Sequence, residues 1–314
     1  MTATVGIDMG GTKLLAVRIE DGDVVAREVF TTPGEDMIGS AIAAIRELWT
    51  EDVTAVGAGI AGLVRFLDGV FVWGPHLPGA NVPIRRLLEA EFGVPAAVDN
   101  DANAAALAEL QYGAARGRQD VLLVTLGTGI GGAIVADGQV YRGSSFAGEW
   151  GHMLYQENGL QCDCGKRGCW ETVASGPALA RLGKEFISLN PEGQLARVLA
   201  QGDFTAETIT ASADAGNETA RGLVSQVGAA LGRGLCSLIA VFDPELVVVG
   251  GGLGSVGESL LGPARRVAAD AIHGGSYRPL PPIVVAELGP ESGAIGAALL
   301  AAKARDGHVS AFLT

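Results

Sequence analysis

The apolar residues near the N-terminus fall into two patterns, short continuous runs and longer stretches with a helical period. The continuous runs predict β-strands at residues 5–8, 14–19, 24–30 and 53–60. Helical spacing predicts one helix over residues 37–49 and another over residues 84–92. The resulting order is strand, strand, strand, helix, strand, helix, which is typical of an α/β protein.

A second strand–turn–strand unit lies in the middle of the chain. Residues 121–126 are an apolar run, residues 127–132 are a glycine-rich turn, and residues 133–135 are another apolar run. This arrangement repeats that of residues 5–19. The sequence therefore predicts an internal duplication.

The last part of the chain returns to alternating helices and strands. A helix over residues 228–241 precedes a buried strand that begins at residue 246 and ends in three glycines. A last strand at 283–286 precedes a final helix, and residues 173–230 show helical spacing without further detail. Cys236 lies in an apolar helix and is predicted to be a buried core thiol.

The two glycine-rich turns are candidate phosphate sites. Backbone N–H groups at Gly10, Gly11 and Thr12 can approach phosphate oxygens because glycine carries no side chain. Asp8, at the end of the preceding strand, can hold Mg²⁺ directly or through water. The turn lacks the strand-to-helix order and the Gly-Lys-Ser/Thr ending of a P-loop. Taken alone, an ordinary hairpin is the alternative.

Composition and charge narrow the classes of function. The chain has 314 residues, enough for two domains with full cores, and a formal net charge of −13. This charge argues against a nucleic-acid surface and against adhesion to an anionic membrane. No apolar run reaches the ~18 residues of a membrane span, and residues 1–4 leave no room for a signal peptide. We expect a cytoplasmic protein without nucleic-acid or membrane partners.

A cluster of metal-binding side chains follows the second turn. One imidazole and three thiolates form a complete tetrahedral set for a structural Zn²⁺, namely His152, Cys162, Cys164 and Cys169. Two carboxylates, Glu149 and Glu171, frame this set, so zinc would fix both acids relative to His152. The alternatives are a disulfide and unliganded buried thiols. The short Cys-x-Cys step disfavours a disulfide.

These residues also carry a resemblance to a known family. Residues 148–152 (GEWGH) and 162–171 (CDCGKRGCWE) resemble the signature of the ROK family, which comprises bacterial sugar kinases and sugar-responsive repressors. The resemblance implies a two-domain, actin-like (ribonuclease H-like) α/β ATPase fold with an interdomain cleft. It implies an N-terminal lobe of residues 1–115 joined by a C-terminal helix, 291–314, and a C-terminal lobe of residues 116–290 that includes the zinc segment 148–171.

The resemblance extends to residues 100–103 (Asn-Asp-Ala-Asn) at the junction between a strand and a helix. Asp101 occupies a natural N-cap position there, and a plain cap is the alternative to a catalytic role. In the family's segment the Asp accepts the proton of a sugar hydroxyl, which implies that Asp101 is the catalytic base. The sugar ligands implied by the family are Asn100, Asp101, Glu149, His152 and Glu171. His152 would bind zinc with one ring nitrogen and face a hydroxyl with the other.

The family also implies where the nucleotide binds. Both glycine-rich turns would hold the phosphates, and the glycines after the third strand of the second lobe would hold adenosine against bare backbone. The implied residues are Asp8, Gly10, Gly11, Thr12, Lys13, Gly127, Thr128, Gly129, Gly131, Gly250, Gly251 and Gly252. The chain departs from many ROK glucokinases at His76 and Ala80, where an Asn and a Trp are common. Contact between His76 and sugar is therefore left open.

The sequence thus predicts an ATP-dependent hexokinase that uses Mg²⁺ and a structural Zn²⁺, with glucose as substrate and glucose 6-phosphate as product. Other acceptors left open are N-acetylglucosamine, N-acetylmannosamine, mannose and fructose, and polyphosphate is left open as donor. The rivals from other classes are a sugar-sensing repressor and an actin-like filament or chaperone ATPase. A repressor would carry an N-terminal helix-turn-helix ahead of the first phosphate strand. We expect a homodimer or homotetramer.

Overall fold

The computed structural model describes residues 2–31, 36–199 and 204–307. Contacts divide the chain into two compact units. Unit 1 comprises Met1–Gln119, Ala133–Gly148 and Glu287–Thr314, and unit 2 comprises Asp120–Gly132 and Glu149–Ala286. The sequence analysis placed residues 133–148 in the second lobe, whereas the contact grouping places them in unit 1. The end of the predicted C-terminal helix, 308–314, lies outside the described residues.

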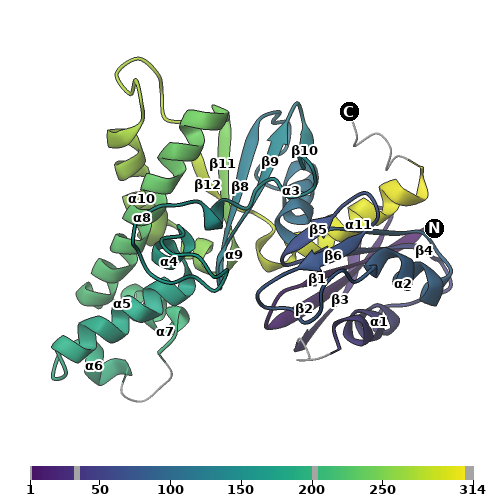
Figure 1. Ribbon diagram of the computed structural model, residues 1–314, viewed down its shortest axis with the longest axis horizontal. Helices are drawn as coiled ribbons and strands as arrows, with labels where there is room; N and C mark the ends of the chain where they lie inside the picture. Colours follow the sequence, from purple (N-terminus) through teal and green to yellow (C-terminus); the bar gives the residue numbers. More distant parts are fainter. Residues whose placement is uncertain (1, 32–35, 200–203, 308–314) are drawn as a thin grey trace. The chain divides into compact units, whose positions relative to one another are not determined.

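Unit 1 contains a five-stranded sheet of order β3-β2-β1-β4-β7 (Figure 1). Its strands are β1 (Ala3–Met9), β2 (Lys13–Glu20), β3 (Asp23–Thr31), β4 (Val53–Ile60) and β7 (Ala96–Asn100). The pairs β1/β2 and β2/β3 are antiparallel, and β4 lies parallel to both β1 and β7. A small separate sheet pairs β5 (Leu63–Arg65) with β6 (Val70–Trp73), two strands that the apolar pattern did not predict.

Helices cover both faces of this sheet. Helices α1 (Met37–Glu47) and α2 (Ile84–Phe92) pack with β1 and β4 in one apolar core. Helices α3 (Asp101–Tyr112) and α11 (Ser292–Arg305) cover the other face, where they share a second apolar cluster with β2. The predicted order of three strands, helix, strand and helix is confirmed, with β5 and β6 inserted before α2.

Small residues on β1 and β4 bring α11 directly onto the sheet. A Cβ atom at Gly6 would lie 2.1 Å from the carbonyl oxygen of Ala294, and one at Gly57 would lie 1.9 Å from that of Ala297. Because side chains alternate along a strand, Asp8 shares the α11 face of β1 with Gly6. The Asp8 carboxylate accordingly lies at the start of α11, where a Cβ at Gly293 would be 2.4 Å from its Oδ2.

The second sheet has the order β10-β9-β8-β11-β12. Its strands are β8 (Val121–Leu126), β9 (Ile130–Ala136), β10 (Gln139–Tyr141), β11 (Leu246–Gly250) and β12 (Ile283–Val285). Strand β11 runs parallel to β8 and to β12. Of these strands only β10 escaped the sequence pattern, because its three residues (QVY) do not form a continuous apolar run, unlike those of the equally short β12 (IVV).

The stretch expected to be helical contains several short helices of unit 2. They are α4 (Glu171–Ala174), α5 (Gly176–Leu189), α6 (Gln194–Leu199) and α7 (Ala206–Asp214), followed by α8 (Glu218–Phe242). Two further helices, α9 (Gly251–Gly254) and α10 (Glu258–Ala271), follow β11, and single 3₁₀ turns, η1 and η2, lie at Trp150–His152 and Gly289–Glu291.

Helix α8 is the central helix of unit 2. It packs closely on α10, since a Cβ at Gly228 or Gly232 would lie 2.4 or 2.3 Å from a carbonyl oxygen of α10. Within the described residues α8 alone is long and apolar enough to cross a membrane, and 56% of its apolar stretch is buried inside the protein. The prediction that Cys236 is fully buried is wrong: the thiol is only partly covered, because the side chain lies near the edge of the packed face of α8.

Candidate active site and metal centre

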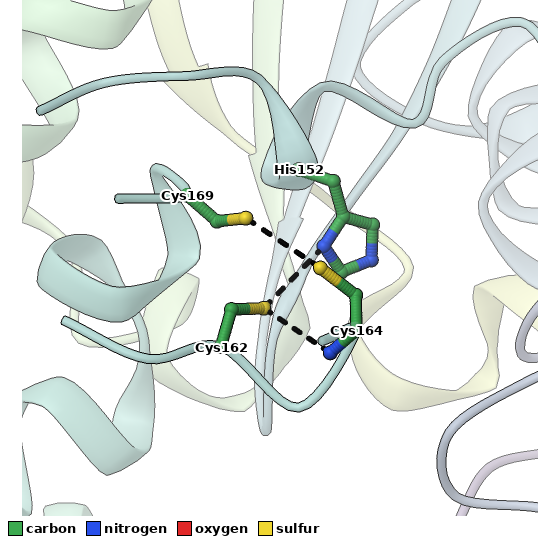
Figure 2. Close-up of side chains that lie close together, drawn as sticks. All are labelled: His152, Cys162, Cys164 and Cys169. Atoms are coloured by element: carbon green, nitrogen blue, oxygen red, sulfur yellow. Dashed lines mark hydrogen bonds between the residues drawn. The ribbon is translucent and has the colours of Figure 1, made fainter. Parts of the chain in front are cut away.

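The four predicted zinc ligands converge in unit 2 (Figure 2). Their ligand atoms all lie within 4.8 Å of one another. The Sγ of Cys162 is 3.7 Å from Nδ1 of His152, and the Sγ atoms of Cys164 and Cys169 are 3.6 Å apart. A tetrahedron with metal–sulfur distances of about 2.3 Å has edges of roughly 3.8 Å. The set therefore fits a closed Zn²⁺ site.

The disulfide alternative is contradicted by the same geometry. All four cysteines are free in the described part of the chain. A sulfur–sulfur separation of 3.6 Å between Cys164 and Cys169 is far beyond the ~2.05 Å of a disulfide bond. The thiols thus face one common centre and are not bonded in pairs.

Two tryptophans anchor the segment that carries these ligands. Trp150, at the start of η1, lies over Gly132 of β9 and donates a hydrogen bond to the carbonyl oxygen of Gly131 at 3.3 Å. Trp170 is fully buried against Gly234 of α8 and donates to the carbonyl oxygen of Ala230 at 3.1 Å. His152 follows Trp150 by two residues, and Cys169 directly precedes Trp170. The two tryptophans therefore fix these ligands to the rest of unit 2.

Glycine is required where the loop between the anchors turns back. Gly168 has a φ of +77°, in the left-handed region. A Cβ there would also lie only 1.9 Å from the carbonyl oxygen of Gln156. This turn brings Cys169 beside Leu154, with which it forms an isolated β-bridge. The short spacing of the cysteines can then close around one point.

The thiols need a cation to ionise. Burial, and next the hydrogen bond to Glu171, raise the pKa of Cys162. Burial and the neighbouring Cys164 raise the pKa of Cys169. A thiolate is the form that binds a metal, so the positive charge of Zn²⁺ would supply what the protein surroundings do not.

Glu171 connects the metal centre to the second glycine-rich turn. Its Oε1 lies 2.9 Å from Sγ of Cys162 and 3.3 Å from Nδ1 of His152. Its Oε2 accepts a hydrogen bond from the backbone N–H of Ile130 at 3.4 Å. A Cβ at Gly129 would lie 2.5 Å from the same oxygen. The predicted sugar ligand is thus adjacent to the predicted phosphate turn.

His152 and Glu149 occupy one short turn. The backbone N–H of His152 donates to the carbonyl oxygen of Glu149 at 3.1 Å. Because Nδ1 of His152 is the ring nitrogen that faces Cys162, Nε2 points away from the metal centre (Figure 2). The predicted contact of this second ring nitrogen with a sugar hydroxyl stays a prediction.

The second phosphate turn is closed by its own backbone and by α5. Gly127 N–H donates to the carbonyl oxygen of Gly129 at 3.0 Å, and Gly176 N–H donates to that of Gly127 at 2.9 Å. Thr128 is left exposed at the tip. A cavity of about 350 Å³ opens beside it, between the zinc segment and the start of α5, with Glu171 and Arg181 in its lining.

Gly250, at the end of β11, and Gly251 and Gly252, at the start of α9, form the surface where adenosine binding is predicted. Gly251 has a φ of +79°, and a Cβ there would lie 2.4 Å from the carbonyl oxygen of Leu126. Gly252 is exposed and has open space where a side chain would be. Gly250 is the last residue of β11, next to this surface. Gly131 lies at the start of β9, next to the second turn, and both strands belong to the same sheet.

The first phosphate turn lies in unit 1 between β1 and β2. Gly10 N–H donates to the carbonyl oxygen of Lys13 at 2.9 Å, which leaves Thr12 and Lys13 exposed at the tip. A Cβ at Gly11 would lie 2.6 Å from Cβ of His76. His76, whose contact with sugar was left open, therefore rests on the phosphate turn.

Asn100 and Asp101 join β7 to α3, and one detail of their prediction is wrong. The N-cap of α3 is Asn100, not Asp101. Asn100 has the extended backbone of a cap (φ −63°, ψ 147°), and its Oδ1 accepts from the N–H groups of Ala102 and Asn103 at 2.9 and 3.2 Å. Asp101 is the first helical residue, so its carboxylate is not needed as the cap. Nδ2 of Asn100 donates to the carbonyl oxygen of Gly62 at 3.2 Å.

Asp8 and Asp101 influence each other in unit 1. Burial, and then the Asp101 carboxylate, raise the pKa of Asp8 to about 8. Burial also raises the pKa of Asp101, against the lowering effect of nearby backbone N–H groups. Two adjacent acids with raised pKa values are a common arrangement where a proton or a divalent cation is held.

Sequence reasoning missed a buried ion pair beside these acids. Arg142, in the loop after β10, contacts Asp99 with both side chains almost fully buried. Asp99 directly precedes Asn100, so its place in the sequence already suggested a position near the site. Nothing in the sequence indicated that Asp99 pairs with a residue 43 positions later. Polar residues that pair across such a separation leave no periodic pattern.

Comparisons with known proteins were consistent with each other. A model described as the ROK family matches residues 4–304. A glucokinase of Streptomyces coelicolor is 36% identical over 313 residues, covering 96% of this chain and 98% of that protein. The crystal structure of a ROK family glucokinase from Streptomyces griseus with glucose and AMPPNP has a TM-score of 0.89 and 35% identity, covering 96% and 99% of the two chains.

A ROK hexokinase structure from Thermus thermophilus is also similar, with a TM-score of 0.73, 36% identity, and coverage of 96% and 98%. The predicted actin-like α/β ATPase fold is confirmed by these likenesses. The resemblance inferred from residues 148–171 is confirmed over nearly the whole chain.

Proposed function

The chain belongs to the ROK family, and from this premise we propose that it is an ATP-dependent glucokinase that makes glucose 6-phosphate. The observation that carries this function is the likeness to glucokinases along nearly the full length of both chains. The complete His-Cys₃ set beside Glu171 supports it independently, because the set fits the structural zinc expected of such a kinase. The enzyme transfers a phosphoryl group from ATP to glucose.

Asp101 is the proposed catalytic base. It lies at the start of α3, free of the capping role that Asn100 performs. Its carboxylate would accept the proton of the glucose 6-hydroxyl while that oxygen attacks the terminal phosphorus of ATP. A base whose pKa is raised by burial is better matched to a hydroxyl than an ordinary exposed Asp.

Further sugar ligands are proposed in each unit. In unit 2, Glu149, Glu171 and Nε2 of His152 can accept from or donate to sugar hydroxyls, which act as donors and acceptors. In unit 1, Asn100 would bind a sugar hydroxyl beside Asp101, while its Nδ2 also donates to the carbonyl oxygen of Gly62. Zinc would hold His152 and fix the segment before Glu171, so its role is structural.

The two glycine-rich turns are proposed to hold the phosphates of ATP. The exposed tips at Thr12, Lys13 and Thr128 offer backbone N–H groups and an ammonium group to phosphate oxygens. Asp8 would hold Mg²⁺, which neutralises charge on the transferring phosphoryl group when bound. The open backbone at Gly252 would support the adenosine.

A panel of acceptors tests the proposed substrate. Steady-state rates with MgATP are measured for glucose, mannose, fructose, N-acetylglucosamine and N-acetylmannosamine, and the position of the phosphate is read by NMR. We expect the highest kcat/KM for glucose and phosphate on the 6-oxygen. A higher kcat/KM for an N-acetylated sugar would reassign the substrate, and equal rates with polyphosphate would reassign the donor.

The setting of the reaction stays a prediction. The net charge of −13 supports an enzyme without nucleic-acid or membrane partners in the cytoplasm. A homodimer or homotetramer is the expected assembly, and static light scattering of the purified protein measures it directly.

A further inference from the structure

The buried ion pair of unit 1 joins Arg142 to Asp99 of β7, two residues before the proposed base Asp101. Nε and Nη2 of Arg142 lie 2.7 and 2.6 Å from Oδ2 of Asp99. The two side chains are only 6% and 2% exposed. Nη1 of Arg142 donates to the carbonyl oxygen of Val140 at 3.0 Å, and the guanidinium lies 4.0 Å above the ring of Phe66.

The second oxygen of Asp99 holds the residues on either side of Asp101. Oδ1 accepts a hydrogen bond from the backbone N–H of Asn100 at 2.8 Å and from Nδ2 of Asn103 at 3.0 Å. Asn103 lies in the first turn of α3, and Asn100 is the cap of that helix. Asp99 therefore fixes the last residue of β7 and the first turn of α3 to one carboxylate.

We propose that Arg142, acting through Asp99, is a positioning residue for the base Asp101. This inference rests on the proposed function. Arg142 belongs to the segment Ala133–Gly148, which lies in unit 1 although residues before and after it lie in unit 2. The residue that sets the position of the base thus belongs to unit 1, although the stretches of chain on either side of its segment belong to unit 2.

The physical reason lies in the cost of a buried, unpaired carboxylate. Without the guanidinium, the buried carboxylate of Asp99 would lose the partner that contacts its Oδ2 through two nitrogens, and a buried charge without a well-placed partner is costly. The carboxylate would then shift in search of another partner, and its hydrogen bonds to Asn100 and Asn103 would be distorted. The strand–helix junction would then relax, and a displacement of about 1 Å at a reacting group can cost roughly 100-fold in rate.

Lysine cannot replace arginine in this arrangement. The guanidinium contacts Asp99 through two nitrogens, contacts Val140 through the third, and stacks on Phe66. A lysine ammonium is a compact charge without the planar fork of a guanidinium, so it can replace only some of these contacts. Arg142→Lys keeps the positive charge while it removes the geometry, which makes it the informative substitution.

The experiment is a double-mutant cycle on kcat. Wild type, Arg142→Lys, Asp101→Asn and the double variant are assayed with saturating glucose and MgATP. We expect Arg142→Lys to lower kcat by about 10- to 100-fold in the wild-type background. In the Asp101→Asn background the same change should lower kcat by less than about twofold, because no base is left to be positioned.

A purely structural ion pair gives a different result. Arg142→Lys would then lower the melting temperature, while its fold-effect on kcat per folded molecule would be the same in both backgrounds, or absent. Either result overturns the proposal. Asp99→Asn, which keeps an acceptor oxygen but loses the charge, provides a second variant and should follow Arg142→Lys.

Two controls separate this inference from the proposed function. Arg18→Lys alters another arginine of the same unit, which contacts Thr50 and Glu20, and should leave kcat unchanged in both backgrounds. The Asp101→Asn variant alone tests the base. If it keeps wild-type kcat, the proposed base fails, whereas equal effects of Arg142→Lys in both backgrounds refute only the positioning role.

Discussion

The two glycine-rich hairpins of the molecule share a backbone plan but differ in what surrounds them. Asp8 precedes Gly10 by two residues in the first, and Thr125 precedes Gly127 by two residues in the second. The first turn therefore has an acid beside it, under the start of α11, while the second has a neutral hydroxyl. The second turn instead receives its acid, Glu171, from the zinc segment.

Under the proposed function, this difference corresponds to different roles of the two hairpins. In unit 1 the acids Asp8 and Asp101 have raised pKa values, as suits a cation site and a base. In unit 2 the turn is clamped by α5 and by Glu171, as suits a fixed cradle for phosphate next to sugar. Under the proposed function, the first hairpin would contribute the reacting acids, and the second would position the phosphates.

The largest expected effect comes from removing the chemistry of unit 1. Asp101→Asn keeps the size of the side chain but cannot accept the proton, so kcat should fall by about 10²–10⁴-fold while glucose still binds. The helix cap is untouched because Asn100 provides it. Steady-state kinetics and a glucose-binding titration measure both quantities. A kcat within about threefold of wild type would rule out the base.

Removing the metal centre should mainly damage unit 2. Cys164→Ala deletes one of four zinc ligands, so we expect loss of zinc and displacement of Glu171 and His152. KM for glucose should rise by about 10- to 100-fold, the usual cost of losing support around a metal ligand. Metal analysis and kinetics check this. One zinc per chain together with a normal KM would contradict the assignment, and Cys236→Ala is the matched control.

A smaller effect separates the two turns directly. Gly129→Ala places a methyl group against the carboxylate of Glu171, whereas Gly11→Ala places one against His76. We expect Gly129→Ala to raise KM for glucose by about 10-fold, the effect of one hydrogen bond to a charged group. Gly11→Ala should raise KM for MgATP and leave KM for glucose near wild type. The same response in both variants would remove the distinction between the hairpins.

A further expected effect is on stability and depends on pH. The folded-state pKa of Asp8 is about 8, above its unfolded value of 3.8. The native state therefore binds the extra proton between these values, and stability without Mg²⁺ falls as pH rises through this window. The slope from one proton is at most about 1.4 kcal/mol per pH unit. Burial of Asp101 acts in the same direction.

Asp8→Asn should flatten this dependence. Urea unfolding at pH 5 and pH 8 should show a smaller difference for the variant than for wild type, and the variant should gain relative to wild type at pH 8. Glu28→Gln, on the exposed strand β3, serves as the control with an unchanged profile. An identical pH profile for Asp8→Asn and wild type would mean that Asp8 titrates as an ordinary carboxyl group.

Sequence could predict those parts of the molecule whose determinants are close together in the chain. The hairpin at residues 3–20 and the ligands between 152 and 169 are local, so apolar runs and ligand spacing were sufficient. The helix cap was misplaced by one residue because Asn and Asp are equally good caps, and only the backbone at Asn100 distinguishes them.

Other features depended on contacts between distant residues. Strands β5 (LVR) and β10 (QVY) each include a polar residue and so offer no continuous apolar run, unlike the equally short β12 (IVV), which was predicted. The contact of Arg142 with Asp99 joins two polar side chains 43 residues apart, and Arg142 lies in an irregular loop after β10. The support of the site was therefore invisible in the sequence even where its functional residues were recognisable.

The seating of α11 on the first strands has a consequence for synthesis of the protein. Gly6 and Gly57 are covered by Ala294 and Ala297, which the ribosome adds only after all of unit 2. At roughly 5–20 residues per second, the face of the first sheet that α11 covers stays without that helix for tens of seconds. During translation, unit 2 can complete its core while unit 1 still exposes an apolar face to chaperones, although unit 1 emerges first.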